Sequence, residues 1–344
     1  MTNWKTYRLG DICTLNYGKA LTATNRVAGD IPVYSSAGIT GSHNVALVQS
    51  KGIIVGRKGT VGSVYYSDKP FYCIDTAYYI LPDDEKYDFK WLYYRLKSLH
   101  LDKLNEDSAV PGLNRETAYA QEFPLPPLEE QRRIAGILGA IDDKIENNRR
   151  INTNLELQAQ ALYKQWFVDN RSDDWETKKL SEFFNVVTGK KDANFSTTDG
   201  EYPFFTCSQD VLKAPDYSFE GAAILLAGNG DFNVKRYIGK FEAYQRTYVL
   251  IPFDRKYHSF LYLTIKHYLQ EITGGSRGSV IKFITKGNIA DFEVALPQIN
   301  IDDKLAVLDS LYQTIDGNMT ENENLATLRD TLLPKLMNGE IITK

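Results

Sequence analysis

The sequence is duplicated, and the duplication restricts the chain to folds that contain two similar halves. When the 344 residues are compared with themselves at a shift of 171, identical residues coincide in the same order along both halves. The coinciding positions are Trp4 and Trp175, Leu9 and Leu180, Gly18-Lys19 and Gly189-Lys190, Pro32 and Pro203, Gly59 and Gly230, Thr76 and Thr247, and Leu125-Pro126 and Leu296-Pro297. Such a series at nearly one shift predicts two copies of one domain.

Each repeated segment is followed by a long helical pattern. After Leu125-Pro126-Pro127, apolar or small residues recur at alternating steps of four and three over residues 128–167, which corresponds to a helix about 60 Å long. A second heptad pattern runs from Leu305 to Leu332 and includes Met319 and Leu328. We expect Pro334 to end or kink this helix near Leu333, because proline interrupts the backbone hydrogen bonds of a helix.

The two helices are predicted to pack on each other as an antiparallel coiled coil, because two apolar seams in one chain can bury each other. Seam asparagines fix the register of such a pair where they meet. We expect Asn148 or Asn152 to contact Asn318 or Asn322, and the alternative, in which these side chains face solvent, stays open. The residues expected to pair the helices are Ile141, Ile145, Asn148, Asn152, Leu155, Ile315, Asn318, Asn322 and Leu325.

The remaining segments, 1–125 and 173–298, are predicted to be mixed α/β globules joined by the helical segments 126–172 and 299–344. The fold class is therefore α+β, with two duplicated globules and two long helices. Strands are expected at 31–34, 45–48, 52–55, 61–66 and 77–81 in the first globule and at 202–207, 222–227 and 248–252 in the second. One helix is expected in each globule, at 89–104 and at 257–272.

The sequence offers no chemistry for catalysis. It contains no GxxxxGK[ST] loop, no HExxH, no GxSxG and no Asn/Asp-Pro-Pro-aromatic sequence of the kind that amino-methyltransferases use. The three cysteines lie far apart, which argues against disulfides and zinc and favours the cytoplasm, and the four histidines form no ligand set. No apolar run is long enough to cross a membrane. We therefore expect a binding protein with no catalytic or metal site.

A glycine-rich loop with two cations is the strongest candidate for binding. In Gly56-Arg57-Lys58-Gly59-Thr60, glycines would let the backbone approach a phosphate, and arginine can also read guanine. The duplicate segment, Gly228-Asn229-Gly230-Asp231-Phe232-Asn233, keeps the glycines and offers Asn229 and Asn233, which suit adenine. The alternative is a tight hairpin with incidental polar residues. A net charge of −4 counts against nucleic acid, although the acidic surplus lies in residues 299–344.

Further candidates for contacts with phosphates lie near these loops. Lys19 and its duplicate Lys190 each follow a glycine. A basic, hydroxyl-rich loop at 274–279 carries Arg277 and is followed by Lys282, and its counterpart in the first copy ends with Asn114 and Arg115. Solvated surface lysines and an ordinary linker are the alternatives.

Three segments resemble the specificity subunits of type I restriction–modification systems. Pro124-Leu125-Pro126-Pro127-Leu128-Glu129-Glu130-Gln131 is similar to their central conserved region, and residues 332–340 are similar to their C-terminal conserved region. Residues 56–60 with 74–79 resemble a variant of their target recognition domains. The second helix start, Leu296-Pro297-Gln298-Ile299-Asn300, departs from the Glu-Glu-Gln pattern.

The resemblance implies two target recognition domains that each read half of a bipartite double-stranded DNA sequence. It also implies partnership with two methyltransferase subunits, which use S-adenosylmethionine, and with two restriction subunits that use ATP and magnesium. This chain itself would hold no cofactor. Two other interpretations stay open from the residues alone: an RNA-binding module with a GxxG loop at Gly56–Gly59, and a coiled-coil adaptor that does not bind DNA.

Overall fold

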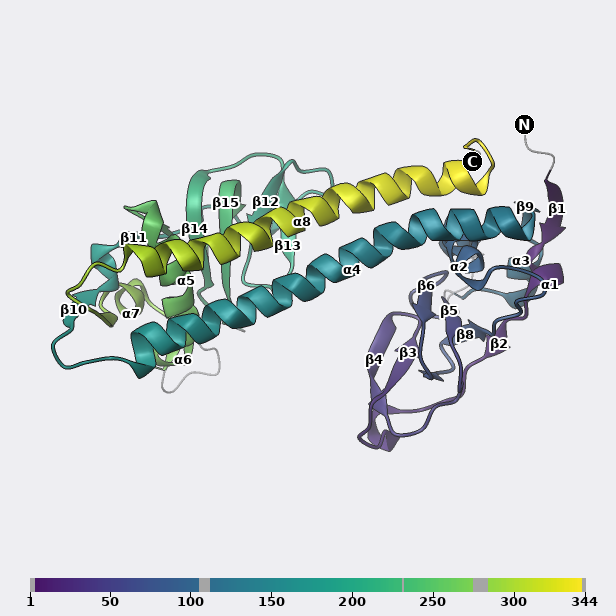
Figure 1. Cartoon of the computed structure of the whole chain (residues 1–344), viewed down its shortest axis with the longest axis horizontal. Helices are drawn as coiled ribbons and strands as arrows, with labels where there is room; N and C mark the ends of the chain where they lie inside the picture. Colours follow the sequence, from purple (N-terminus) through teal and green to yellow (C-terminus); the bar gives the residue numbers. More distant parts are fainter. Residues whose placement is uncertain (1–3, 105–111, 231, 275–283, 342–344) are drawn as a thin grey trace. The chain divides into compact units, whose positions relative to one another are not determined.

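The computed structural model describes residues 4–104, 112–230, 232–274 and 284–341, and Figure 1 traces the chain. The chain divides into two compact units, one made of residues 1–147 and 321–344 and the other of residues 148–320. We call them unit 1 and unit 2. The two long helices, α4 (Leu128–Lys164) and α8 (Asp302–Met337), each contribute one part to unit 1 and one part to unit 2. Among the described residues, no helix is long and apolar enough to cross a membrane.

Unit 1 contains two small sheets and a two-stranded ribbon. The four-stranded sheet has the order β2 (Asn16–Tyr17), β8 (Ala77–Ile80), β5 (Gly52–Gly56) and β6 (Val64–Ser67), and the three-stranded sheet has the order β4 (Gly38–His43), β3 (Ile31–Ser35) and β7 (Tyr72–Cys73). The ribbon pairs β1 (Lys5–Arg8) with β9 (Glu122–Leu125). Among its described residues, the α-helices besides α4 and α8 are α1 (Leu9–Ile12), α2 (Phe89–Ser98) and α3 (Arg115–Tyr119).

Unit 2 repeats this strand order in a continuous sheet. The six strands follow the order β11 (Phe184–Thr188), β16 (Thr247–Pro252), β14 (Phe219–Ala227), β15 (Val234–Ala243), β12 (Tyr202–Phe205) and β13 (Val211–Ala214). A ribbon of β10 (Glu176–Lys179) and β17 (Glu293–Leu296) matches β1 and β9. Apart from α4 and α8, the α-helices in the part of unit 2 that the structure describes are α5 (His258–His267), α6 (Leu269–Thr273) and α7 (Lys286–Ala290).

The strands that form one six-stranded sheet in unit 2 are divided between two sheets in unit 1, and the division falls between β6 and β7. The long strand β15 occupies the positions that β6 and β7 occupy in unit 1, and both β15 and β7 pair in parallel with a neighbour, β12 or β3. In unit 1, Pro70 lies between β6 and β7. The interruption runs from Asp68 to Phe71, and Pro70 within it cannot donate a hydrogen bond to a neighbouring strand. The topology itself is duplicated, as the repeat predicts.

Each unit has its own core, and both long helices enter it. In unit 1, Ile134 and Leu138 of α4 and Leu336 and Met337 of α8 pack with the buried side chains of α2. In unit 2, the helix residues that join the core are Ala159 and Tyr163 of α4 and Leu305, Leu308, Tyr312 and Ile315 of α8. The burial of these apolar side chains in the core of each unit holds the two helices to the globules.

The helices α4 and α8 pack together in an antiparallel sense. Within unit 1, Asp142 pairs with Arg329 and the later Lys144 pairs with the earlier Glu321, at 2.8 and 3.2 Å. Within unit 2, the Asn318 amide donates a hydrogen bond of 2.8 Å to Asn152 Oδ1, so the asparagine contact predicted from the sequence is present. The Asn152 amide also donates to the Ile315 carbonyl at 3.3 Å, which ties the pair to the backbone of α8.

Several details of the helices differ from the prediction. Helix α8 does not end near Leu333 but continues through Pro334 to Met337. Leu336 and Met337 are fully buried, and the Arg95 guanidinium donates to the Met337 carbonyl, so the last turn is held by the core of unit 1. Met319 and Leu328, expected in the seam, are 54% and 48% exposed, whereas their neighbours Asn318 and Arg329 donate hydrogen bonds to Asn152 and Asp142 of α4.

Most predicted strands are present with shifted ends, and one is absent. Residues 45–48 form no strand, because only Val48 reaches a partner, in a single bridge to Phe71. The segment predicted at 61–66 begins as a turn, and β6 starts at Val64. The helix expected at 89–104 is α2 followed by a 3-10 turn, and the helix expected at 257–272 is divided into α5 and α6 at Tyr268.

Candidate nucleic-acid interface

In unit 1, the glycine-rich loop connects β5 to β6 and is fixed by backbone hydrogen bonds. The amides of Arg57 and Lys58 both donate to the Thr76 carbonyl, at 2.9 and 3.0 Å, and the Leu113 amide donates to the Arg57 carbonyl at 2.8 Å. Gly59 has a φ of +79°, a conformation that favours glycine at this turn. The loop is therefore held between β8 and the start of α3, with Lys58 and Thr60 exposed.

Two arginines in unit 1 share one aromatic partner. The guanidinium of Arg57 lies 5.0 Å from the ring centre of Tyr17, and that of Arg115 lies 5.2 Å from the same ring. Tyr17 is 47% exposed, so the group lies at the surface. Cation–π contacts restrict where long arginine side chains point. Tyr17 is not among the residues predicted from the sequence, although it directly precedes the Gly18-Lys19 pair.

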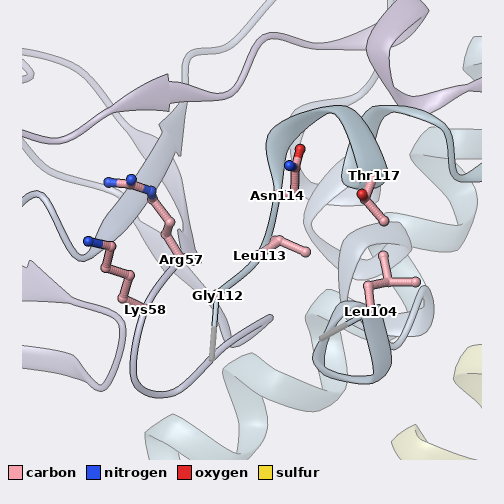
Figure 2. A pocket seen from close by; sticks show the side chains of 7 residues that line it. All are labelled: Arg57, Lys58, Leu104, Gly112, Leu113, Asn114 and Thr117. Atoms are coloured by element: carbon pink, nitrogen blue, oxygen red, sulfur yellow. The ribbon is translucent and has the colours of Figure 1, made fainter. Parts of the chain in front are cut away.

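A pocket of about 310 Å³ lies beside these cations. Its described lining residues are Arg57, Lys58, Leu104, Gly112, Leu113, Asn114 and Thr117. Figure 2 shows the two cationic side chains on one side and Asn114 and Thr117 on the other. The arrangement offers positive charge and polar side chains to an anionic or polar ligand, with Leu104 and Leu113 as apolar surface.

Asn114, predicted to contact DNA, also caps a helix in the structure. Its Oδ1 accepts a hydrogen bond of 2.8 Å from the Glu116 amide, which caps the N-terminus of α3. A bidentate contact with adenine uses both the oxygen and the nitrogen of an asparagine amide. In this conformation the oxygen is already engaged, so Asn114 acts first as a helix cap.

Unit 2 repeats the backbone hydrogen bonds that hold this loop, which we call the loop framework, but with different side chains. The Gly228 amide donates to the Arg246 carbonyl at 2.9 Å, and the Ile284 amide donates to the Gly228 carbonyl at 3.1 Å. A tyrosine hydroxyl braces each framework: Tyr78 donates to the Leu113 carbonyl at 3.1 Å and Tyr248 donates to the Ile284 carbonyl at 2.7 Å. The duplicated loops therefore occupy matching positions in the two units.

The second asparagine predicted to read DNA in unit 2 lies inside the protein. Asn233 is buried, its amide donates to the Cys207 carbonyl at 2.8 Å, and its Oδ1 accepts from Lys235 Nζ at 2.6 Å. Burial lowers the pKa of Lys235 below its ordinary value. Since both ends of the Asn233 amide are engaged within the fold, this residue braces the loop in the observed conformation and does not present its amide to a ligand. Asn229 is partly exposed.

The other candidates are placed as follows. Lys19 and Lys190 are exposed, and a single glycine separates each of them from the strand at the edge of its sheet, β2 or β11. Arg277 and Lys282 lie outside the described residues. No described group of three or more histidine, cysteine or acidic side chains could hold a metal ion. Burial raises the pKa of the Cys13 and Cys73 thiols to about 12, so both stay protonated and are poor nucleophiles.

Comparison with known proteins places the chain in a family. The model of the type I restriction modification DNA specificity domain matches residues 1–157 and 172–327, one segment for each repeat. The specificity subunit of the EcoDI type I restriction enzyme from Escherichia coli is 42% identical over 173 residues, which are 49% of this chain and 39% of that subunit. The MjaIX specificity subunit from Methanocaldococcus jannaschii is 25% identical over 84% of this chain and 77% of its own length.

A solved structure shares the fold. The crystal structure of a type I restriction-modification S subunit from M. genitalium superposes with a TM-score of 0.67 at 20% identity and covers 97% of this chain and 96% of its own. The family is the specificity component of restriction–modification complexes and is not catalytic within them. The duplicated units, the paired helices and the match of both repeats agree: the chain belongs to the family of type I restriction–modification DNA specificity subunits.

Proposed function

We propose that each unit reads one half of a bipartite duplex DNA target and that the helical pair sets the unread gap between the halves. The observation that carries this proposal is that the DNA specificity domain model matches two separate segments, each of which contains the same braced loop. The loops differ in chemistry, with Arg57 and Lys58 in unit 1 and Gly228 and Asn229 in unit 2. Different side chains on one framework suit two half-sites of different sequence.

In unit 1, the cations around the pocket supply the affinity for DNA. Lys58 and Lys19 are exposed and offer point charges to phosphates, while Arg57 and Arg115 offer guanidiniums that suit either a phosphate or the O6 and N7 atoms of guanine. Phosphate contacts fix the position of a protein on the duplex, and base contacts provide the sequence information. The pairing with Tyr17 holds both guanidiniums near one surface.

The chemistry would reside on partner subunits. We infer that two methyltransferase subunits bind this chain and bring S-adenosylmethionine, and that two restriction subunits bring ATP and magnesium, in the cytoplasm. The chain would then select the DNA sequence and hold no cofactor. The segments 1–125 and 173–298 would act as the recognition domains, and 126–172 and 299–344 as the spacer.

A domain exchange tests the assignment of half-sites. The chain is expressed with its modification subunit in a host that lacks adenine methylation, and the methylated motif is determined by sequencing. Replacement of residues 173–298 by the corresponding segment of another family member should change one half of the motif and leave the other half unchanged. A motif that changes in both halves, or a single undivided motif, would contradict the proposal.

The spacer role has its own test. Four residues inserted into both α4 and α8 lengthen each helix by about 6 Å, which is close to two base pairs of DNA. The methylated motif should then contain a longer gap between unchanged halves. Insertion into α4 alone is the control, because it shifts Asn152 away from Asn318 and should lower activity without producing a new gap. An unchanged gap after the double insertion counts against the spacer role.

A further inference from the structure

The two units place a single arginine at equivalent points of the loop framework, but on opposite sides of it. In unit 1 the amide of Arg57 donates to the carbonyl of Thr76, and in unit 2 the amide of Gly228 donates to the carbonyl of Arg246 at 2.9 Å. The residues just before and after these partners are paired in the same way, Gly56 with Ala77 and Ala227 with Thr247. Gly228 and Arg246 therefore occupy the positions of Arg57 and Thr76.

The structure explains why the arginine changes sides. A Cβ atom at Gly228 would lie 2.5 Å from the Arg246 carbonyl oxygen, which is closer than real Cβ contacts allow. The loop side of the framework in unit 2 therefore has no room for a side chain. In unit 1 the opposite side is occupied, because the Thr76 hydroxyl accepts a hydrogen bond of 3.3 Å from the Ser36 amide. Each unit thus carries its arginine on the side that is available.

The Arg246 side chain is free to meet a ligand. It is exposed, and within the described ranges its guanidinium makes no hydrogen bond or ion pair. Its own backbone is fixed, since the Arg246 carbonyl accepts from the Gly228 amide and from the Cys207 thiol. The nearby Asp192 carboxylate accepts from the Gln245 amide. An arginine whose backbone is fixed and whose guanidinium has no partner among the described residues is suited to bind an external anion or the edge of a nucleic-acid base.

We propose that Arg246 is the residue of unit 2 that contacts the DNA target, in the role that Arg57 has in unit 1. This inference rests on the proposed function of the two units. A guanidinium at this position binds either a phosphate or the major-groove edge of guanine, and both contacts use the same donor groups. Alignment of the repeats at one constant shift obscures the equivalence, because the shift is 171 for Gly228 and 170 for Arg246.

The test uses Arg246→Ala in the complete complex with its modification subunit. Arg246→Lys, which keeps the charge but not the planar donors, is the second variant. The control is Arg255→Ala, because Arg255 is an exposed arginine of unit 2 that lies beyond the other end of β16. The methylated motif is read in the host, and affinity for a duplex that carries the motif is measured at several salt concentrations. Arg57→Ala is measured in parallel.

We expect Arg246→Ala to weaken binding roughly 5- to 150-fold, the range for loss of a specific arginine contact. A base contact predicts relaxed sequence preference at one position, in the half-site that Arg57→Ala leaves unchanged, and Lys only partly rescues it. A phosphate contact predicts an unchanged motif, a salt slope smaller by about 1, and rescue by Lys. Because the side chain is exposed, the unfolding temperature should equal that of the control.

Two results separate failure of this inference from failure of the proposed function. If the wild-type complex methylates a bipartite motif but Arg246→Ala matches wild type in affinity, motif and salt slope, Arg246 has no role in recognition and the inference is overturned. If the wild-type complex yields no bipartite motif, the proposed function itself has failed. Should Arg246→Ala be unstable, the same comparison is made with Arg246→Gln, which retains the length of the side chain.

Discussion

Units 1 and 2 share the backbone hydrogen bonds of the glycine-rich loop but differ in the side chains that this loop carries. In both, a tyrosine hydroxyl holds the carbonyl that precedes a short capped helix, Tyr78 for α3 and Tyr248 for α7. On that framework, unit 1 gathers Arg57 and Arg115 around an exposed tyrosine, whereas unit 2 has Thr188 at the position of Tyr17 at the same shift of 171. The comparison shows that the framework can be kept while the chemistry changes.

The two units also attach the long helices differently. In unit 1, the Tyr94 hydroxyl and Arg329 both donate to the Asp142 carboxylate, so one acidic group of α4 links α2 and α8. In unit 2 the links are separate ion pairs, Lys266 with Glu156 at 2.6 Å and Arg236 with Asp316 at 2.7 Å. Each unit thus combines apolar burial with charged hydrogen bonds that fix the helices in one register.

The largest expected difference between the units is in their response to acid. His258, in unit 2, is fully buried, and burial lowers its pKa to about 4. In an unfolded chain the pKa is about 6.5, so as the pH falls from 6.5 to 4 the unfolded state binds a proton that the folded state does not. This contribution to stability is complete above pH 6.5 and is lost on acidification, by about 3 kcal/mol.

The His258 prediction is checked by urea unfolding between pH 4 and pH 7, with hydrogen exchange of β14 to report on unit 2. His258→Phe removes the titrating group and should flatten the dependence on pH of unit 2 relative to wild type. At a shift of 171, Tyr87 of unit 1 coincides with His258, and burial raises the pKa of Tyr87, so unit 1 serves as the internal control. Equal pH dependence in wild type and variant would show that His258 does not cause the sensitivity.

A smaller effect is expected at the acidic link of unit 1. Tyr94→Phe removes the 2.6 Å hydrogen bond to Asp142, and loss of a bond to a charged group should lower the free energy of unfolding by about 2 kcal/mol. Tyr93→Phe is the control, because the Tyr93 hydroxyl makes no hydrogen bond in the described structure. Denaturant unfolding measures both variants, and equal losses would mean that the Asp142 contact contributes little.

The smallest effect is expected at Tyr17. Tyr17→Leu removes the ring that orients Arg57 and Arg115 and should weaken DNA binding about fivefold, or about 1 kcal/mol, since exposed cation–π contacts are weak. Tyr17→Phe retains the ring and should bind like wild type. The effect should be confined to the half-site read by unit 1. A matching loss in Tyr17→Phe would instead indicate that the hydroxyl contacts DNA.

The sequence predicted the features that depend on local periodicity and on repetition. The duplication and the long helices follow from spacing, and the contact between Asn152 and Asn318 is one of the pairings that the spacing allowed. Residues whose role depends on distant neighbours were missed. Tyr17 contacts arginines far along the chain, and Arg246 is equivalent to Thr76 only through a backbone hydrogen bond. Asn233 was assigned to the surface because a polar residue after a glycine turn gives no indication of burial.

Pro334 illustrates how tertiary structure overrides a local rule. A proline near the end of a helix removes a single backbone donor, and the fully buried Leu336 and Met337 stabilise the turn that follows. The rule that proline ends a helix describes an isolated segment. The rule does not include the contacts that this segment makes with the core of unit 1, because the residues of that core lie far away in the sequence.

The two units differ in the order in which their segments are synthesised. Unit 2 is one contiguous segment, so all of its core has been synthesised once residue 320 emerges. Unit 1 is discontinuous, and its core lacks Leu336 and Met337 until residues 321–344 follow. Residues 1–147 are therefore translated before unit 2 but can complete their folding only after it. A nascent chain that stops before residue 321 would leave unit 1 with an exposed hydrophobic surface, although unit 2 would be complete.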